Sequence, residues 1–272
     1  MASPRTLPVT LCGSLSRLAS PLGRSMHEAG YRALGVAFTY VPFEVLDLRG
    51  AITGMRALGI RGFGVSQPYK QEVMGLVDAL EPTAERIGAV NTVVNTAGRL
   101  VGHNTDWVGA IRALEEAYSL PGARVLLMGA GGAARAIAFG LRDRRAVATI
   151  ANRDRTKAEA LAAETGARGV GLEEAAKAGD YDVVINATAI GQADTSAPSP
   201  VPASAFRAGQ VVMDIVYKPI DTPLLATARQ HGATAIHGGR MLLHQAASQF
   251  ELYTNLPAPL EAMEAALRVM TG

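Results

Sequence analysis

The feature that most constrains the fold of this chain is a glycine-rich turn near its middle. Val125 to Met128 has the length and composition of a buried strand, and Gly129-Ala130-Gly131-Gly132-Ala133 follows it directly. An alanine-rich segment with helical character comes next. Strand, glycine turn and helix open a dinucleotide-binding unit, in which backbone N–H groups approach a pyrophosphate at the positive end of the helix. A tight turn without a ligand gives the same pattern, so the context has to decide.

The next strand supplies that context. Ala146 to Ala151 is apolar and ends in the polar run Asn152 to Lys157, where a dinucleotide fold meets the adenosine ribose. An acidic residue at this point favours NAD, whereas an arginine such as Arg153 favours the 2′-phosphate of NADP. We therefore predict NADP as the cofactor, with NAD possible because Asp154 adds a negative charge.

Size and composition limit the classes of protein to consider. With 272 residues the chain can form two domains with substantial cores. A net charge of +2 without blocks of like charge gives no support for binding to nucleic acid or to a membrane. Cys12 is the only cysteine, which excludes an internal disulfide and fits a reducing compartment. No apolar run reaches the roughly 20 residues of a membrane span, and residues 1–10 do not resemble a signal peptide. We expect a cytoplasmic protein.

Strand-like and helix-like segments alternate along the chain. Predicted strands are Leu7–Gly13, Val36–Val45, Gly62–Ser66, Ala89–Val94, Leu100–His103, Asp182–Asn186, Gln210–Ile215 and Thr234–Ile236, and predicted helices include Arg24–Leu34, Asp47–Leu58, Thr105–Tyr118, Thr222–Gln230 and Arg240–Tyr253. The alternation predicts an α/β protein with mainly parallel sheets. Two helices, Arg240–Tyr253 and a final one that starts at Pro257 and Pro259, follow a completed nucleotide unit. We therefore predict a discontinuous substrate-binding and catalytic domain, residues 1–104 and 239–272. A doubly wound Rossmann-type domain, residues 105–238, is inserted into it.

A hydroxyl-rich loop is predicted between the first strand and the first helix. It contains Ser14, Ser16 and Ser20. Hydroxyls before a helix usually cap it, which accounts for at least one of these serines. The others could hold a substrate carboxylate at the helix N-terminus.

Several short motifs, in order along the chain, carry a family resemblance. They are Val65-Ser66-Gln67-Pro68-Tyr69-Lys70, Gly88-Ala89-Val90-Asn91-Thr92, Asn104-Thr105-Asp106 and Asp214 to Pro219 with Thr222-Pro223-Leu224-Leu225. Together with the glycine turn, Asn152-Arg153 and the run Gly238 to Gln245, they resemble the shikimate dehydrogenase family from end to end. The run Arg56 to Gly62 and the serine loop are more similar to its shikimate-dehydrogenase-like branch.

The resemblance implies a catalytic pair, Lys70 and Asp106. Reduction of a ketone leaves an alkoxide that needs a proton, and oxidation of the alcohol requires its removal; a lysine oriented by a carboxylate can do both. Taken alone, Lys70 could be a solvated surface lysine and Asp106 a helix cap.

The resemblance also implies binding residues. Ser66, Asn91, Tyr217 and Gln245, with the three loop serines, would bind the hydroxyls and carboxylate of a polyol acid. Residues implied to bind the cofactor are Gly129, Ala130, Gly131, Gly132, Ala133, Asn152, Arg153, Lys157, Ile215 and Gly238. Asn91 could instead satisfy loop backbone, Gln245 could be an ordinary helix residue, and Arg153 and Lys157 could be solvated charges.

The serine loop departs from the family pattern, because its serines are displaced relative to His27. Carboxylate recognition is therefore expected to differ, and three hypotheses stay open. The first is an NADP-dependent enzyme that interconverts shikimate and 3-dehydroshikimate, or acts on quinate or an aminoshikimate. The second is a dehydrogenase of another small hydroxy acid, and the third is a nucleotide-binding regulatory protein without turnover. The five histidines show no metal-ligand spacing, so no metal is predicted. Either a monomer or a homodimer is compatible with the sequence.

Overall fold

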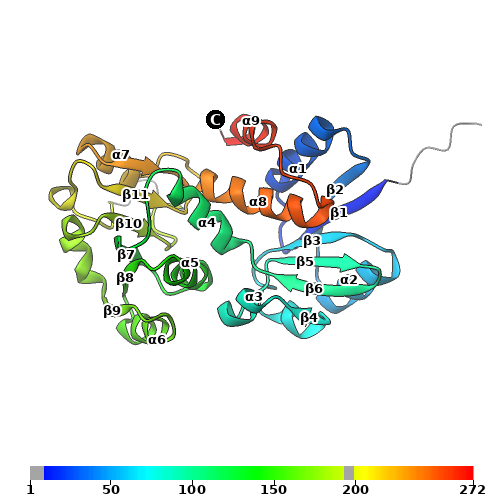
Figure 1. Cartoon of the computed structure of the whole chain (residues 1–272), viewed down its shortest axis with the longest axis horizontal. Helices are drawn as coiled ribbons and strands as arrows, with labels where there is room; N and C mark the ends of the chain where they lie inside the picture. Colours follow the sequence, from blue (N-terminus) through cyan, green and yellow to red (C-terminus); the bar gives the residue numbers. More distant parts are fainter. Residues whose placement is uncertain (1–8, 193–198, 272) are drawn as a thin grey trace, which may run out of the picture. The chain divides into compact units, whose positions relative to one another are not determined.

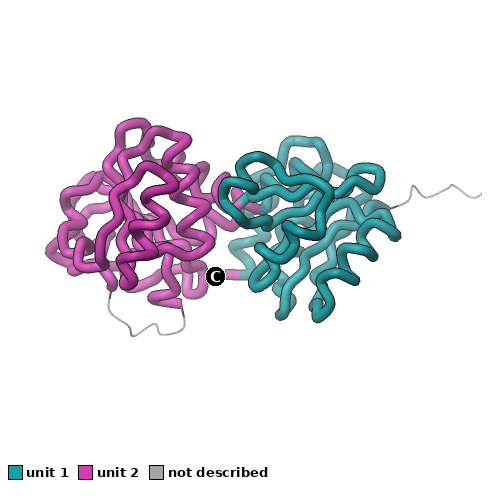
Figure 2. Tube along the Cα trace, turned by 90° about the horizontal axis from the view of Figure 1, so that it is seen from below, with its two compact units in different colours: residues 1–105, 246–270 teal, residues 106–245, 271–272 magenta. Residues whose placement is uncertain are grey.

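The chain folds into two compact units. The computed structural model describes residues 9–192 and 199–271. Unit 1 comprises residues 1–105 and 246–270, and unit 2 comprises residues 106–245 with 271–272 (Figure 2). The boundary after residue 105 lies one residue from the predicted domain boundary. The boundary before residue 246 lies seven residues beyond the predicted one, inside a helix.

Unit 1 is built on a six-stranded mixed sheet (Figure 1). Its strands are β1 (Thr10–Ser16), β2 (Phe38–Glu44), β3 (Gly62–Val65), β4 (Ala79–Leu80), β5 (Thr92–Thr96) and β6 (Arg99–His103), in the order β2-β1-β3-β5-β6-β4. Its helices are α1 (Pro21–Leu34), α2 (Leu48–Ala57), the 3₁₀ helix η1 (Glu72–Leu76), α3 (Pro82–Ile87), the C-terminal part of α8 (Gly238–Thr254) and α9 (Leu260–Thr271). Antiparallel pairing of β5 with both β3 and β6 makes the sheet mixed.

The two faces of this sheet differ in polarity. Phe63 and Val65 of β3 face an apolar cluster that includes Ile52 and Met55 of α2. Because side chains alternate along a strand, Gly62 and Gly64 face the other way. There the glycines leave room for α8, since a Cβ on Gly62 would lie 2.1 Å from the Tyr253 ring. The α8 side therefore carries polar and aromatic groups close to the backbone.

The prediction of a loop at Ser14 and Ser16 was wrong. Strand β1 continues through Ser16, paired in parallel with β2 along its whole length. Leu7, where the strand was predicted to begin, lies outside the described residues. Pairing with a neighbouring strand overrides the local turn preference of serine and glycine. The following helix also begins earlier than expected, at Pro21, with Ser20 as its N-cap.

Unit 2 contains a six-stranded parallel sheet. Its strands are β7 (Arg124–Met128), β8 (Val147–Asn152), β9 (Arg168–Gly171), β10 (Val183–Asn186), β11 (Val211–Asp214) and β12 (Thr234–Ile236), in the order β12-β11-β10-β7-β8-β9. Its helices are α4 (Asp106–Glu115), α5 (Gly132–Asp143), α6 (Arg155–Thr165), α7 (Pro223–Gln230), the first part of α8 and the 3₁₀ helices η2 (Leu172–Asp180) and η3 (Ala203–Ala205). This strand order is that of a doubly wound nucleotide-binding fold, as predicted.

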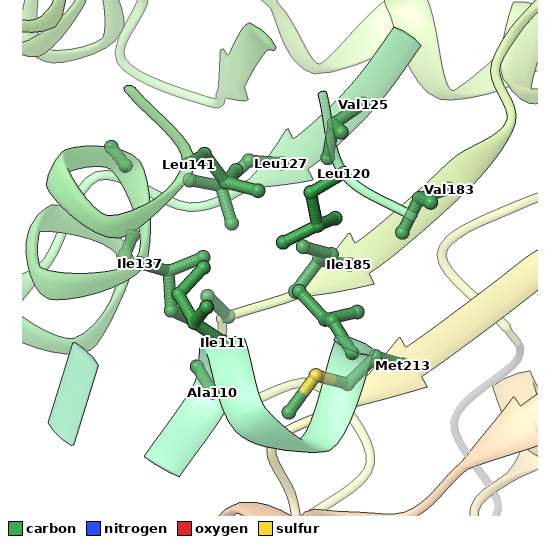
Figure 3. Packing of buried hydrophobic residues seen from close by; sticks show 14 of the residues in the cluster. Ala110, Ile111, Leu120, Val125, Leu127, Ile137, Leu141, Val183, Ile185 and Met213 are labelled. Atoms are coloured by element: carbon green, nitrogen blue, oxygen red, sulfur yellow. The ribbon is translucent and has the colours of Figure 1, made fainter. Parts of the chain in front are cut away.

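Both faces of the unit 2 sheet are buried, which explains its continuous apolar strands. Val125 and Leu127 of β7 pack with Ile137 of α5 and Ile111 of α4 in one cluster (Figure 3). The alternate β7 residues Leu126 and Met128 belong to a second cluster with α7 and η2. The sheet is thus a rigid platform whose carboxyl edge carries the loops described below.

Among the helices of the described residues, α8 is the longest, with 17 residues. The guanidinium of Arg61 donates to the main-chain oxygens of Leu252 and Tyr253, at 3.0 and 2.8 Å, and so caps the end of this helix. In the two ranges that the structure describes, no helix combines the length and the apolar character needed to cross a membrane.

Candidate functional site

The strand order of unit 2 creates a cavity at the carboxyl edge of its sheet. Strands β7 and β10 are neighbours, and the chain runs outward from them in opposite directions, which makes this the topological switch point where ligands bind in such folds. The loops after both strands line one cavity of about 540 Å³. Its lining is Gly129, Ala130, Gly131, Asn152, Arg153, Leu172, Ala187, Thr188, Ala189 and Ile190. This volume suits a small-molecule ligand or cofactor.

The glycine turn is required by its backbone geometry. Gly129 has φ +117°, a conformation that side chains disfavour, and a Cβ there would lie 2.7 Å from the main-chain oxygen of Ala187. Helix α5 begins at Gly132, and its N-cap residue, Gly131, makes no side-chain hydrogen bond to the helix. The first N–H groups of a helix lack intrahelical partners and carry its positive partial charge. The turn therefore offers an anion site to a pyrophosphate.

An adjoining cavity of about 550 Å³ lies at the end of β8. It is lined by Ala130, Gly131, Asn152, Arg153, Asp154 and Lys157. Arg153 makes no hydrogen bond or ion pair with any described residue, whereas the Lys157 ammonium lies 3.8 Å from the Asp154 carboxylate. Asp154 also caps α6 by accepting from the Lys157 N–H at 3.4 Å. Two cations and one anion thus surround the space where an adenosine 2′-substituent would sit, and the donor set fits a phosphorylated dinucleotide.

The loop Ala187–Ile190 was missed by the sequence reasoning. It follows β10 and forms one wall of the first cavity. Its position at the carboxyl end of a strand next to the glycine turn was the signal that could have found it.

Ile215 and Gly238, both predicted to bind the cofactor, come together after β11. A Cβ on Gly238 would lie 2.3 Å from the main-chain oxygen of Ile215. The N–H of Gly238 donates to the main-chain oxygen of Val216 at 3.2 Å. Only glycine permits this approach. Tyr217 is half-buried two residues further along the loop from Ile215.

In unit 1, Lys70 lies just beyond β3. The Gln67–Pro68 peptide is cis, and the Lys70 side chain is half-buried. The main-chain oxygen of Lys70 accepts from the N–H of Val90 at 2.8 Å. The segment Ala89–Asn91 therefore fixes the backbone that carries Lys70.

The same segment holds the residues before Asp106. The Asn91 side chain is fully buried, and its oxygen accepts from the Thr105 N–H at 2.7 Å. Its amide nitrogen donates to the Thr105 hydroxyl at 3.0 Å. Asn104 donates to Ala89 O at 3.0 Å. Asp106 follows as the first residue of α4 and is 4% exposed. The alternative that Asn91 satisfies loop backbone agrees with these contacts.

Gln249 is a second residue that sequence reasoning missed. Its amide donates to Thr92 Oγ1 at 3.0 Å and to Asn91 O at 3.3 Å, and it is 5% exposed. Gly64 makes room for it, because a Cβ there would lie 3.2 Å from both Gln249 Nε2 and the Tyr40 hydroxyl. The available signal was its spacing of one helical turn from Gln245.

The three serines near the N-terminus occupy different environments. Ser14 hydrogen-bonds the Tyr40 hydroxyl, whose pKa burial raises. The Ser16 hydroxyl donates to Leu18 O at 2.8 Å, and Ser20 accepts from Leu22 N at 3.4 Å as a helix cap. They do not form one cluster on a loop. Ser66, just after β3, is exposed.

Gln245 lies on the part of α8 that belongs to unit 2. Helix α4 approaches it closely at Gly109, where a Cβ would lie 3.0 Å from Gln245 Cβ and 2.5 Å from Met241 O. The backbone position of Gln245 is thereby fixed against α4. In the described part of the chain, no group of three or more His, Cys, Asp or Glu side chains could hold a metal ion.

Comparison with known proteins gives family matches along the chain. Residues 16–93 match the family described as shikimate dehydrogenase substrate binding domain. Residues 112–215 match shikimate / quinate 5-dehydrogenase, and residues 238–268 match the shikimate 5'-dehydrogenase C-terminal domain.

Individual relatives cover nearly the whole chain. A shikimate dehydrogenase (NADP(+)) of Haloarcula marismortui is 45% identical over 260 residues, which is 92% of this chain and 97% of the relative. The crystal structure of Thermus thermophilus shikimate 5-dehydrogenase with NADP(H) and shikimate has a TM-score of 0.88 and 36% identity, covering 96% and 99% of the two chains. A Corynebacterium glutamicum quinate dehydrogenase in complex with NAD also has a TM-score of 0.88, at 32% identity and with coverage of 96% and 99%.

Proposed function

This chain belongs to the shikimate dehydrogenase family, and we propose that it is an NADP-dependent oxidoreductase that interconverts shikimate and 3-dehydroshikimate. The observation that carries the proposal is the double anchoring by Ala89–Asn91. This segment accepts or donates hydrogen bonds at both places where catalytic groups are proposed, the Lys70 main chain and Thr105 before Asp106. Such anchoring suits side chains that must be held for chemistry.

Lys70 and Asp106 are the proposed acid–base pair. When a secondary alcohol is oxidised, its O–H proton passes to the neutral Lys70 amine as the C–O bond becomes a carbonyl. Bound NADP would supply the acceptor for the hydride that leaves carbon. In the opposite direction the Lys70 ammonium protonates the developing alkoxide. Asp106 orients the amine and stabilises its protonated form. Proton transfer of this kind contributes about 10² to 10⁴-fold to a rate.

Binding of the polyol acid is proposed for residues of each unit. In unit 1 they are Ser14, Ser66 and Asn91, and in unit 2 they are Tyr217 and Gln245. The other two serines, Ser16 and Ser20, are proposed as weaker contributors, because the hydrogen bonds of their hydroxyls to nearby main chain compete with a ligand.

The cofactor is proposed to lie in the two cavities of unit 2. The turn Gly129–Ala133 would hold the pyrophosphate, and Arg153 and Lys157 the 2′-phosphate. Asn152, Ile215 and Gly238 would line the rest of the site. These residues supply N–H groups and cations where NADP carries negative charge.

The test is turnover measured at the absorbance band of reduced nicotinamide, with NADP and shikimate. Wild type is expected to reduce NADP, and Lys70→Gln should lower kcat by at least about 100-fold while NADPH binding stays within about twofold. Lys177→Gln is the matched control, because Lys177 is an exposed lysine paired with Glu174. Equal kcat in Lys70→Gln and wild type would refute the proposed role of Lys70.

Quinate is the second candidate substrate. The match of residues 112–215 to shikimate / quinate 5-dehydrogenase and the likeness to a quinate dehydrogenase structure favour it as an alternative. Faster NADP or NAD reduction with quinate than with shikimate would select it. NADPH binding without turnover on either acid, on an aminoshikimate or on other small hydroxy acids would instead support a regulatory protein.

We also propose a cytoplasmic location and a monomeric or homodimeric state. Cys12 is buried and forms no disulfide, which suits a reducing compartment. Sedimentation velocity distinguishes the two states, and a larger particle would contradict both.

A further inference from the structure

A buried carboxylate joins three segments at the carboxyl edge of the unit 2 sheet. Asp214 ends β11 and is completely buried. It accepts from the Thr222 hydroxyl at 2.7 Å, the Asn186 amide at 3.0 Å and the Val216 N–H at 3.1 Å. Thr222 caps α7, Asn186 ends β10, and Val216 lies in the loop after β11. One side chain thus fixes the ends of two strands and the start of a helix.

None of these three donors is charged, and Asp214 forms no ion pair among the described residues. Burial raises the pKa of its carboxyl group, although all three hydrogen bonds oppose this shift. A carboxylate buried without a cation is costly, and an apolar residue would suit the surrounding strands better. Its presence calls for a reason other than packing.

The reason lies in the amide that Asp214 holds. A carboxylate can only accept hydrogen bonds, so Asn186 must turn its nitrogen toward Asp214 and its oxygen away. That oxygen accepts from the Thr188 N–H at 3.1 Å and from the Thr188 hydroxyl at 2.6 Å. The same amide nitrogen also reaches Ile190 O at 3.3 Å. Asn186 therefore clamps the loop Ala187–Ile190 at both ends.

This loop is the wall of the first cavity that faces the glycine turn. It also meets Gly129 directly, because a Cβ there would collide with Ala187 O. We propose that Asp214 is a positioning residue for cofactor binding: by setting the polarity of the Asn186 amide, it holds the loop Ala187–Ile190 in the shape that accepts NADP. The inference rests on the proposed function of this cavity.

The test measures NADPH affinity by fluorescence titration of intact protein, alongside kcat at saturating cofactor. In Asp214→Asn, one of the two acceptor oxygens becomes an NH2 group, so the side chain can no longer accept from Thr222, Asn186 and Val216 together, and its hold on the Asn186 amide weakens. The dissociation constant for NADPH should rise about tenfold, whereas kcat at saturation should change less than about threefold. Asn186→Ala should weaken NADPH binding to a similar extent, and adding Asp214→Asn to it should weaken binding little further, because both changes act through the same amide.

Asp182→Asn is the matched control. Asp182 precedes β10 at the opposite edge of the sheet and binds Arg124 and Arg207. This variant should lose stability but keep NADPH affinity. If Asp214→Asn does not fold, Thr222→Val removes one donor to Asp214 and should weaken binding about threefold.

The outcomes separate the two proposals. No NADPH binding by wild type would refute the proposed cofactor site itself. Wild-type binding with unchanged affinity in Asp214→Asn, or in Thr222→Val where that variant is used, would overturn the positioning role alone. Fully additive losses of affinity in Asn186→Ala with Asp214→Asn would overturn the role assigned to the Asn186 amide.

Discussion

The Asn91 side-chain oxygen accepts the Thr105 N–H at 2.7 Å, across fourteen positions of sequence. Thr92 Oγ1 donates to the same oxygen at 2.9 Å, and Gln249 in turn donates to Thr92. The backbone just before Asp106 is therefore held by a buried network on the α8 side of the unit 1 sheet. The backbone at position 106 therefore depends on Asn91 as well as on its own helix.

We predict that Asn91→Ala lowers both stability and kcat. The change leaves the Thr105 N–H without its acceptor, which costs about 1–3 kcal/mol. Asn95→Ala is the control, because Asn95 is also a buried asparagine, lies in β5 and accepts from Gly98 N at 2.8 Å. Urea unfolding and steady-state kinetics should show a similar stability loss in both, with kcat reduced only in Asn91→Ala. Equal kcat in the two variants would contradict this.

Stability should fall as the pH is lowered below neutrality, through His27. This side chain is fully buried, stacked on Tyr40 with ring centroids 4.4 Å apart, and faces Tyr31 and Tyr253. Burial lowers the pKa of His27 from 6.5 to about 3. The folded state therefore favours neutral imidazole, a contribution that is complete above pH 6.5 and is lost as the pH falls toward 3.

At pH 5 the loss amounts to about 2 kcal/mol. Urea unfolding at pH 7.5 and pH 5 measures it. His27→Phe should reduce the difference, while the exposed His231→Gln should keep it. An unchanged pH dependence in His27→Phe would assign the effect to other groups.

Two glycines in helices should respond oppositely to alanine. Gly109→Ala places a Cβ 2.5 Å from Met241 O, so α4 and α8 must separate at a cost of about 1–3 kcal/mol. Gly54 in α2 has open space, and Gly54→Ala should gain about 0.5–1 kcal/mol from lower backbone entropy. Thermal unfolding of both variants checks this. Destabilisation by Gly54→Ala would contradict the open space found around Gly54.

Cofactor preference should depend on Asp154. Asp154→Ser keeps a helix cap but removes a negative charge beside Arg153, so NADPH should bind about fivefold more tightly, with NADH changed less than about twofold. Asp47→Ser, which alters the equivalent cap of α2, should change neither affinity. Tighter binding of both cofactors would show that the charge acts on the shared part of the dinucleotide and not on the 2′-phosphate.

The sequence determined the features that depend on neighbouring residues. Apolar strand runs, the glycine turn at Gly129 and the alternation of strands and helices identified the doubly wound unit, because periodicity and backbone freedom are local properties. The motifs around Lys70 and Asp106 indicated the family because each is a short run of neighbouring residues.

Only the tertiary structure decided the rest. Ser14 and Ser16 lie in β1 because β2 supplies their backbone partners, which no local pattern around the serines encodes. The roles of Asn91 and Gln249 appear only when segments up to 158 positions apart meet. An amide side chain can satisfy backbone, bind a ligand or face solvent with equal chemistry. Which of these it does is set by the groups that the fold brings within hydrogen-bonding distance.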